Sequence, residues 1–424
     1  MMSAAIAFAL LLAFGLPVGF VMLGASMVYF LQNPMMTSIV AQRMSSGLES
    51  FPLLAIPLFV VAGGAMARGG IAERLYGFCD ALVGHWRGGL AQIAVLNSVF
   101  MGAMSGSANA DAAIDARTVV PVMRKLGYSN AYGSVVSAAS SLIAPVMPPS
   151  IALIVFGLLT NTSIGKLFMG GVIPALIIAI VLMLTVRWTA KRMNLPPSRP
   201  VRASIKEIAG FGRSALWALA MPVMLLFGLR SGWFTPTELG AVAAVYAFSV
   251  GTTVYRGISL RGTYDLFAEA AATTAGVMFI VASASVFSLI LSLEQVPQAL
   301  LGALTAASDN KFVVLAVLNV VLLVLGTVFE GLAIIVILGP LLIQLAQSLE
   351  IDPVHLGVIL VVNTAIGSLT PPVGTVMFTV CSITRCRIEE FTRAFLPFFV
   401  ALIGVLMLLT FVPALVTFLP SVMF

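Results

Sequence analysis

The sequence predicts an all-α polytopic membrane protein, and three observations carry that prediction: its composition, its mean hydropathy and an internal repeat. Hydrophobic residues make up 60% of the 424 residues, charged residues make up only 9%, and the mean hydropathy is +1.10. A water-facing surface requires far more charge, so this composition excludes a soluble globular protein. The third observation is an internal repeat of acidic residues and prolines, described below, which is typical of membrane proteins built from two inverted halves.

Nine apolar runs have about the 20 residues needed to cross a hydrocarbon core. They lie at 3–31, 51–67, 132–160, 167–190, 214–230, 236–255, 271–293, 355–383 and 394–420. The first run lacks a basic leader and is too long for the apolar part of a signal peptide, so we expect one retained helix and no cleavage.

Basic residues predict the orientation of these crossings. The polar segment 187–213 holds seven Lys or Arg residues against one Glu, which places it in the cytoplasm by the positive-inside rule. Nine crossings then predict a cytoplasmic N-terminus and a periplasmic C-terminus. A short basic loop of this kind indicates a topology signal or contact with membrane lipid, and no nucleic acid is expected as a partner.

The internal repeat divides the chain into two halves. In order, the first half contains Asp111, Pro121, Pro148, Pro149 and Pro174, and the second contains Glu330, Pro340, Pro371, Pro372 and Pro397. The offset is 219 residues for the first two positions and 223 for the rest. We predict a first repeat at 1–190, a linker with a connecting helix at 191–235, and a second repeat at 236–424. One connecting crossing makes the second repeat inverted.

Each repeat contains a segment that predicts a re-entrant helical hairpin. Residues 90–126 have two arms around the polar tip "SGSANAD", and residues 311–349 have two arms around "GTVFEG". Irregular backbone at membrane depth is tolerated only where it is buried in protein or lines a cavity. We therefore expect both tips to line a cavity.

A broken transmembrane helix follows each hairpin, at 132–160 and at 355–383. A Pro-Pro pair removes amide hydrogens and frees carbonyl groups in mid-helix. Nearby side chains add hydroxyl and amide oxygens, among them Ser141, Ser150, Asn363 and Thr375. These hard oxygen ligands suit sodium and match zinc poorly. The alternative is that the prolines only kink the helices.

Two roles are possible for the acidic residues at the two tips. Asp111 and Glu330 could cap the helix that follows each tip, or could contact ion or substrate, because carboxylates inside a membrane are costly and usually functional. Neither His85 nor His355 is expected in the site, since both lie at segment ends. Cys79, Cys381 and Cys386 have no metal-binding or redox spacing and predict buried thiols.

Five motifs together resemble the large membrane subunit of tripartite ATP-independent periplasmic (TRAP) transporters. They are "ESFPLLAIPLFVVAGGAMARGGIAERL" (49–75), "MSGSANADAA" (104–113), "PVMPPSIALIVFG" (145–157), "GWFTPTELGAVAAVYAF" (232–248) and "HLGVILVVNTAIGSLTPPVG" (355–374). The resemblance runs nearly the whole length. It implies an elevator-type transporter of the bacterial inner membrane. It also implies that residues 73–89 form an arm helix between scaffold and hairpin, although their amphipathic pattern fits a plain interfacial helix equally well.

The resemblance also implies ions and partners. Two Na⁺ sites would each combine a hairpin tip with the following break. The first would use Ser105, Ser107, Asn109, Ala144, Met147 and Pro148, and the second Gly326, Thr327, Gly367, Thr370 and Pro371. The implied partners are a small four-helix membrane subunit, a periplasmic substrate-binding protein and an organic anion. Glu330 departs from the aspartate usual in the family.

We therefore expect a sodium-coupled importer subunit for an organic acid, such as a dicarboxylate, a sugar acid or a sialic acid, with no organic cofactor. A proton-coupled organic anion transporter or exporter, with Asp111 and Glu330 carrying protons, is the alternative. A channel fits poorly because the polar residues gather at two matched sites. A membrane enzyme fits poorly because "GAMSG" matches no nucleophile motif and neither histidine is spaced to serve Ser105.

Overall fold

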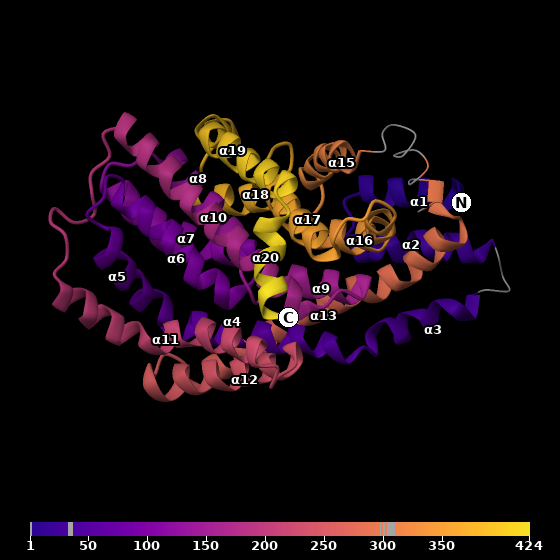
Figure 1. The fold of residues 1–424 in the computed structure, drawn as a ribbon, viewed down its shortest axis with the longest axis horizontal. Helices are drawn as coiled ribbons and strands as arrows, with labels where there is room; N and C mark the ends of the chain where they lie inside the picture. Colours follow the sequence, from indigo (N-terminus) through magenta and orange to yellow (C-terminus); the bar gives the residue numbers. More distant parts are fainter. Residues whose placement is uncertain (1, 33–36, 297, 300–301, 303–309) are drawn as a thin grey trace.

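The computed structural model describes residues 2–424 except 33–36, 297, 300–301 and 303–309. Every regular element in the described part is a helix, as predicted (Figure 1). Helices α11 (Ile205–Ser231) and α12 (Pro236–Ser249) run along one edge, and α15 (Lys311–Gly326) and α19 (Ile388–Phe411) lie at the opposite edge. The first hairpin, the other arm of the second hairpin and the broken helices lie between these edges.

The first predicted crossing is wrong as a single helix. Residues 3–31 form two helices, α1 (Met2–Ala13) and α2 (Val18–Leu31), which pack against each other. Gly15 adopts φ +75°, a left-handed conformation that glycine tolerates, and Pro17 precedes α2 and cannot continue a helix. At 1.5 Å per residue, 12 and 14 residues reach about 18 and 21 Å, short of the roughly 30 Å core. The predicted orientation of the termini rested on this run and stays a prediction.

Seven helical segments are long and apolar enough to cross a membrane, within the described residues. They are Phe51–Arg68, Ile164–Arg192, Ile205–Ser231, Pro236–Val254, Leu260–Leu293, Gly331–Ser348 and Ile388–Phe411. Six correspond to predicted runs. The seventh is an arm of the second hairpin. The other predicted runs, 132–160 and 355–383, are the two broken helices, so nine continuous crossings are not found.

The remaining elements are the helices outside the two hairpins and the two broken helices. They are α3 (Thr37–Leu48), η2 (Phe51–Leu54), α4 (Ala55–Arg68), α5 (Ile71–Val83), α10 (Ile164–Arg192), η4 (Val250–Val254), α13 (Leu260–Leu293) and α20 (Ala414–Met423). The segment expected as an arm helix, 73–89, is helical only as far as Val83, in α5, which packs on α11 and on α6 of the first hairpin. Its role as an arm stays a prediction. The basic segment 187–213 is largely helical, and α11 begins with a capping box in which Ser204 and Glu207 bond each other's backbone amide.

Both hairpins and both broken helices are confirmed. The first hairpin is α6 (Gly89–Ser105) and α7 (Ala108–Lys125), and the second is α15 and α16 (Gly331–Ser348). The first broken helix is α8 (Asn130–Ser140), η3 (Ser141–Ile143) and α9 (Ile151–Thr160), and the second is α17 (Pro353–Gly367) and α18 (Thr375–Thr384). The Pro148–Pro149 and Pro371–Pro372 bonds are both cis.

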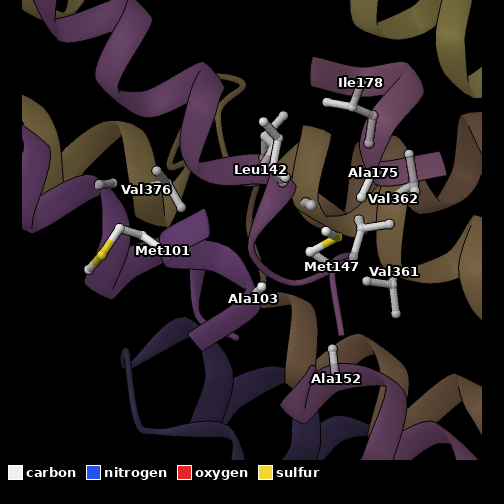
Figure 2. Packing of buried hydrophobic residues seen from close by; sticks show 14 of the residues in the cluster. Met101, Ala103, Leu142, Met147, Ala152, Ala175, Ile178, Val361, Val362 and Val376 are labelled. Carbon is white, nitrogen blue, oxygen red and sulfur yellow. The ribbon is translucent and has the colours of Figure 1, made fainter. Parts of the chain in front are cut away.

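Packing between the halves follows the repeat. Helix α7 of the first hairpin packs on α18 of the second broken helix, and α16 of the second hairpin packs on α9 of the first. Helix α10 also packs on α17, and α19 on α8, so these contacts join the halves as well. Within each half, the first arm of the hairpin packs on the broken helix, α6 on α8 and α15 on α17. Apolar side chains from both halves meet in one buried core, including Met147, Val361 and Val376 (Figure 2). The hairpins and breaks are therefore interleaved.

Candidate functional site

A cavity of about 100 Å³ lies where the two hairpin tips meet the two helix breaks. This exceeds the roughly 10–15 Å³ that one water requires. Its wall includes Ser107, Ala108 and Asn109 from the first tip, Glu330, Gly331 and Leu332 from the second, Ile151 and Ala152 after the first break, and Thr375 and Val376 after the second. The expectation that both tips line a cavity is confirmed.

Four helices begin at this cavity. The first two residues of α7, α9, α16 and α18 all belong to its wall. A helix N-terminus presents unpaired amide groups and a partial positive charge, which favours anions. The wall contains neither Lys nor Arg, so these termini are its source of positive potential.

The first tip lies against the first break. A Cβ added to Gly106 would come within 2.6 Å of the carbonyl oxygen of Pro149, and one on Gly102 within 2.8 Å of the Cα of Ala144. The Ser105 Oγ and Asn109 Oδ1 atoms are buried without a hydrogen-bond partner. Ser107 instead acts as the N-cap of α7 and accepts a hydrogen bond from the amide of Ala110.

The first break contributes unpaired carbonyl groups. Among the turn, loop and side-chain hydrogen bonds of the described residues, none is accepted by the carbonyl of Ala144, Met147 or Pro148. These three predicted ligands therefore have free acceptor oxygens beside a tip whose side-chain oxygens also lack donors. Carbonyl, hydroxyl and amide oxygens therefore lie together here, and these are the ligands that a hard cation prefers.

The second tip is joined to the second break by its backbone. Gly326 and Gly367 approach so closely that a Cβ on Gly367 would lie 2.6 Å from the Cα of Gly326. The carbonyl of Thr327 accepts hydrogen bonds from the amides of Val373 and Gly374, at 3.1 and 2.9 Å. That carbonyl is thus already satisfied.

The hydroxyl groups at the second tip and break point to their own helices. Thr327 Oγ1 donates to the Val324 carbonyl and Thr370 Oγ1 to the Ile366 carbonyl. Each hydroxyl oxygen keeps lone pairs that could accept from, or coordinate, another group. In the described structure, the carbonyls of Thr370 and Pro371 accept no turn or loop hydrogen bond.

The acids occupy different positions. Glu330 takes the N-cap position of α16, but its side chain makes no capping hydrogen bond, and it lies exposed at the cavity wall. Asp111 lies one turn inside α7, where Ser107 is the cap, and is 1% exposed with both carboxylate oxygens unpaired. Neither carboxylate therefore makes a capping hydrogen bond, but Asp111 lies in the first turn of α7, where the helix dipole favours a negative charge.

The remaining predicted side chains are arranged around the breaks. Ser150 caps α9 by accepting from Leu153 and donates to the Pro145 carbonyl. Ser141 donates to the Ala138 carbonyl, which holds its hydroxyl within its own helix. Asn363 donates to Asn319 on the second hairpin. Thr375 begins α18 at the cavity wall.

His355 is buried rather than at the interface that its place at a segment end suggested, and its exclusion from the site stays a prediction. The cysteine prediction is confirmed. His355 is 2% exposed, and its ring Nε2 lies 2.8 Å from the Leu409 carbonyl, because the Pro353 start of α17 directs it into α19 rather than to solvent. The three cysteines are buried and free. None of these side chains belongs to the cavity wall.

Several polar residues near the site were not predicted from sequence. Thr364 lines the cavity, and Asn97, Ser98 and Asp115 are buried within the first hairpin. A signal existed for two of them. The pattern "AVLN" occurs in both first arms, at 94–97 and 316–319, and Asp115 follows Asp111 by one helical turn.

Comparisons with known proteins give the family. The model of the family described as "Tripartite ATP-independent periplasmic transporter, DctM component" matches residues 5–415. The 2,3-diketo-L-gulonate TRAP transporter large permease protein YiaN of Escherichia coli is 38% identical, over 96% of this chain and 95% of its own length. The sialic acid TRAP transporter large permease protein SiaM of Vibrio cholerae is also 38% identical, over 97% and 96%.

Two further comparisons extend this result. The isethionate TRAP transporter permease protein DctMQ of Oleidesulfovibrio alaskensis is 36% identical over 97% of this chain but only 65% of its own length. In fold, the chain is similar to the Alcanivorax borkumensis YdaH transporter, with a TM-score of 0.65 and 17% identity over 90% of this chain and 89% of that one. This chain therefore belongs to the DctM family of tripartite ATP-independent periplasmic transporters, and is a multi-pass large permease rather than an enzyme.

Proposed function

We propose that this chain is the membrane permease of a sodium-coupled importer for an organic acid in the bacterial inner membrane. The observation that carries the proposal is the cavity at which four helix N-termini meet, flanked by buried oxygen acceptors without donors. The N-termini favour an anion and the unpaired oxygens favour a cation. A symporter for an anion and a cation requires that combination.

The residues present fit two sodium ions. In the first site, Ser105 Oγ and Asn109 Oδ1 would bind the ion together with the carbonyls of Ala144, Met147 and Pro148. Ser107 would contribute less, because its hydroxyl already caps α7. Bound sodium supplies a positive charge beside the anion site.

In the second site, the ion would be held by the Thr327 and Thr370 hydroxyls and by the carbonyls of Gly326, Gly367 and Pro371. The Gly326–Gly367 contact brings these groups to one place. Because α15 and α17 both end here, the negative ends of two helices face the ion.

The substrate would lie in the cavity between the tips. Its carboxylate would meet the N-termini of α7 and α18, and Ser107, Asn109 and Thr375 would offer polar groups. The names of the relatives support an organic acid, since diketogulonate, sialic acid and isethionate are all organic anions. Glu330 at the same wall repels an anion unless a cation is present. This charge arrangement favours binding of the anion together with sodium.

Sodium binding and anion binding would be coupled because both ligands would contact the first hairpin tip. Ser107 and Asn109 face the cavity on the tip whose Ser105 and Asn109 oxygens would bind sodium, so an ion that fixes this tip also fixes the anion site. By linkage, each ligand then raises the affinity for the other by the same factor. The interleaved hairpins and breaks would move together against the scaffold in an elevator-type step.

Two partners complete the proposed system. The family name describes a three-part system, and the DctMQ relative extends well beyond the length that this chain covers. We therefore assign this chain a small four-helix membrane subunit and a periplasmic substrate-binding protein as partners. A proton-coupled transporter, with Asp111 and Glu330 as carriers, is the second candidate.

Reconstituted uptake separates these candidates. Proteoliposomes containing this chain, the small subunit and the binding protein are given a radiolabelled organic acid under an inward sodium gradient or an inward proton gradient. We expect accumulation that requires both sodium and the binding protein. Accumulation driven by protons in sodium-free buffer would overturn the ion assignment, and accumulation without the binding protein would overturn the three-part assembly.

A further inference from the structure

A second group of polar side chains lies inside the first hairpin, deeper than the tip. Asn97 and Ser98 on α6, together with Asp111 and Asp115 on α7, form what we call the inner cluster. All four are at most 3% exposed. Asn97 is eight residues before Ser105 and Asp115 eight after Ser107, so both lie about 12 Å along their helices from the tip. Asn97 and Asp115 are thus separate from the proposed tip site, whereas Asp111, four residues after Ser107, lies about 6 Å along its helix from the tip.

The inner cluster contains buried polar atoms whose hydrogen-bonding capacity is not satisfied within the described protein. Asn97 Oδ1, Ser98 Oγ, Asp115 Oδ2 and both carboxylate oxygens of Asp111 are buried and lack a hydrogen-bond partner. Ser98 approaches the carboxylate of Asp111, and Asn97 that of Asp115, so the neutral side chains are directed at the carboxylates. Two adjacent carboxylates removed from water are costly unless an opposite charge compensates them.

No protein cation supplies that charge. Across the described ranges, none of the ion pairs involves Asp111 or Asp115. On the α5 side, the titratable groups that face Asp115 are Tyr76 and Cys79, which carry no positive charge. The Tyr76 hydroxyl is itself buried without a partner. The two carboxylates must therefore be neutralised by bound protons or by a bound cation.

The second hairpin provides an internal comparison. Its equivalent of Asn97 is Asn319, in the repeated pattern "AVLN", and Asn319 is satisfied by Thr410 and Asn363 at 2.8 and 2.9 Å. The equivalent of Asp115, at the offset of 219, is Ile334. At the equivalent place in the second hairpin, neutral hydrogen bonds satisfy the asparagine and an apolar side chain replaces the carboxylate. At this depth, carboxylates and unpaired side-chain atoms therefore occur in the first hairpin and not in the second.

We propose that the inner cluster binds a small hard cation, in addition to the ions at the tips. Carboxylate, amide and hydroxyl oxygens from two facing helices are the ligands such a cation prefers. The bound ion joins α6 to α7 and neutralises charge inside the hairpin. Its binding does not require that the tip sites be correct, so the two proposals fail independently.

Equilibrium binding of ²²Na⁺ to the purified full chain tests this proposal at constant ionic strength with choline as the replacement ion. We expect Asp115→Asn and Asn97→Ala each to lose one bound ion per chain. Asp265→Asn, which neutralises an exposed carboxylate, is the matched control and should lose none. Ser105→Ala should lose a different ion, so the double variant with Asp115→Asn loses two.

A second measurement uses the unmodified protein, so it tests the proposal even if the variants fail to fold. High-resolution maps of the unmodified protein in sodium and in choline should differ by a peak between the Asp111 and Asp115 carboxylates. Competition of the inner-site sodium by Ca²⁺ would support the same site for a hard cation. Unchanged stoichiometry in Asp115→Asn, or identical maps without a peak, would overturn the proposal and indicate that the carboxylates hold protons.

Discussion

Gly326 and Gly367 touch through their backbones at the point where the second hairpin meets the second helix break. A Cβ on Gly326 would lie 2.9 Å from the Cα of Gly367, and the reverse distance is 2.6 Å. No side chain fits between them. This contact lets the Thr327 carbonyl reach the amides of Val373 and Gly374 and fixes the tip on the break. The proposed second sodium site depends on that fixed geometry.

Replacing Gly367 by alanine should therefore impair sodium coupling. The added methyl group forces the tip away from the break, and overpacking of this kind costs about 1–3 kcal/mol. We expect the half-saturating sodium concentration for uptake to rise at least tenfold. Gly404→Ala is the control, since that glycine in α19 has open space around it. Normal sodium dependence in Gly367→Ala would show that the contact is not needed.

Shortening Glu330 to aspartate should stabilise the protein. Glu330 takes the N-cap position of α16 without making a capping hydrogen bond, whereas aspartate is among the preferred capping residues. A formed cap contributes about 0.5–2 kcal/mol. Thermal unfolding of the purified chain in detergent should show a higher midpoint for Glu330→Asp than for Glu330→Gln. Equal midpoints would mean that the shorter side chain does not reach the amides.

The hydrogen bond between Asn319 and Thr410 should contribute measurably to stability. It lies in the buried interior, and Thr410→Val leaves the Asn319 amide without that acceptor. Side-chain hydrogen bonds between membrane helices average about 0.6 kcal/mol and reach roughly 1.7. We expect a loss in that range, measured by thermal or denaturant unfolding. Thr392→Val removes only a bond to its own helix and should change stability less.

The segment between α10 and α11, residues 193–204, is joined to α5 by hydrogen bonds. Asp80 on α5 accepts from Arg199 Nε at 2.6 Å and from Ser198 Oγ at 2.8 Å, and the Ser198 amide donates to the Gly84 carbonyl. Bonds to charged groups contribute about 1.5–3 kcal/mol when partly buried. Limited proteolysis should therefore cleave residues 193–204 faster in Asp80→Asn. Arg202→Ala, an exposed change in the same segment, should leave the rate unchanged.

The sequence predicted the hairpins and breaks because their signals are local. Pro-Pro pairs and polar tips disrupt a helix wherever they occur, and the acid-to-proline spacing aligned the two repeats. The same logic failed at residues 3–31, where apolar composition outweighed the turn signal of Gly15 and Pro17. A hydropathy profile weighs length and composition, and one glycine and one proline in a long apolar run change it little.

The site was predicted less completely, because pairing across a hairpin is a tertiary property. The sequence identified Ser105 and Asn109 as polar residues at a tip but gave no reason to connect Asn97 with Asp115. It also left capping by Asp111 as one of two alternatives, and the structure shows Ser107 at the cap position, because the sequence does not fix the residue at which α7 begins. Likewise, His355 lies near a segment end in sequence yet packs against α19 in space.

The most direct test of the account is a high-resolution map of the permease, bound to its small subunit, in sodium and again in choline. The account predicts sodium-dependent density between the first tip and the first break, in contact with Ser105 Oγ and Asn109 Oδ1, and a second peak beside Thr327 and Thr370. The absence of both peaks from a protein that still imports its substrate would contradict the proposal that the tips and breaks form sodium sites.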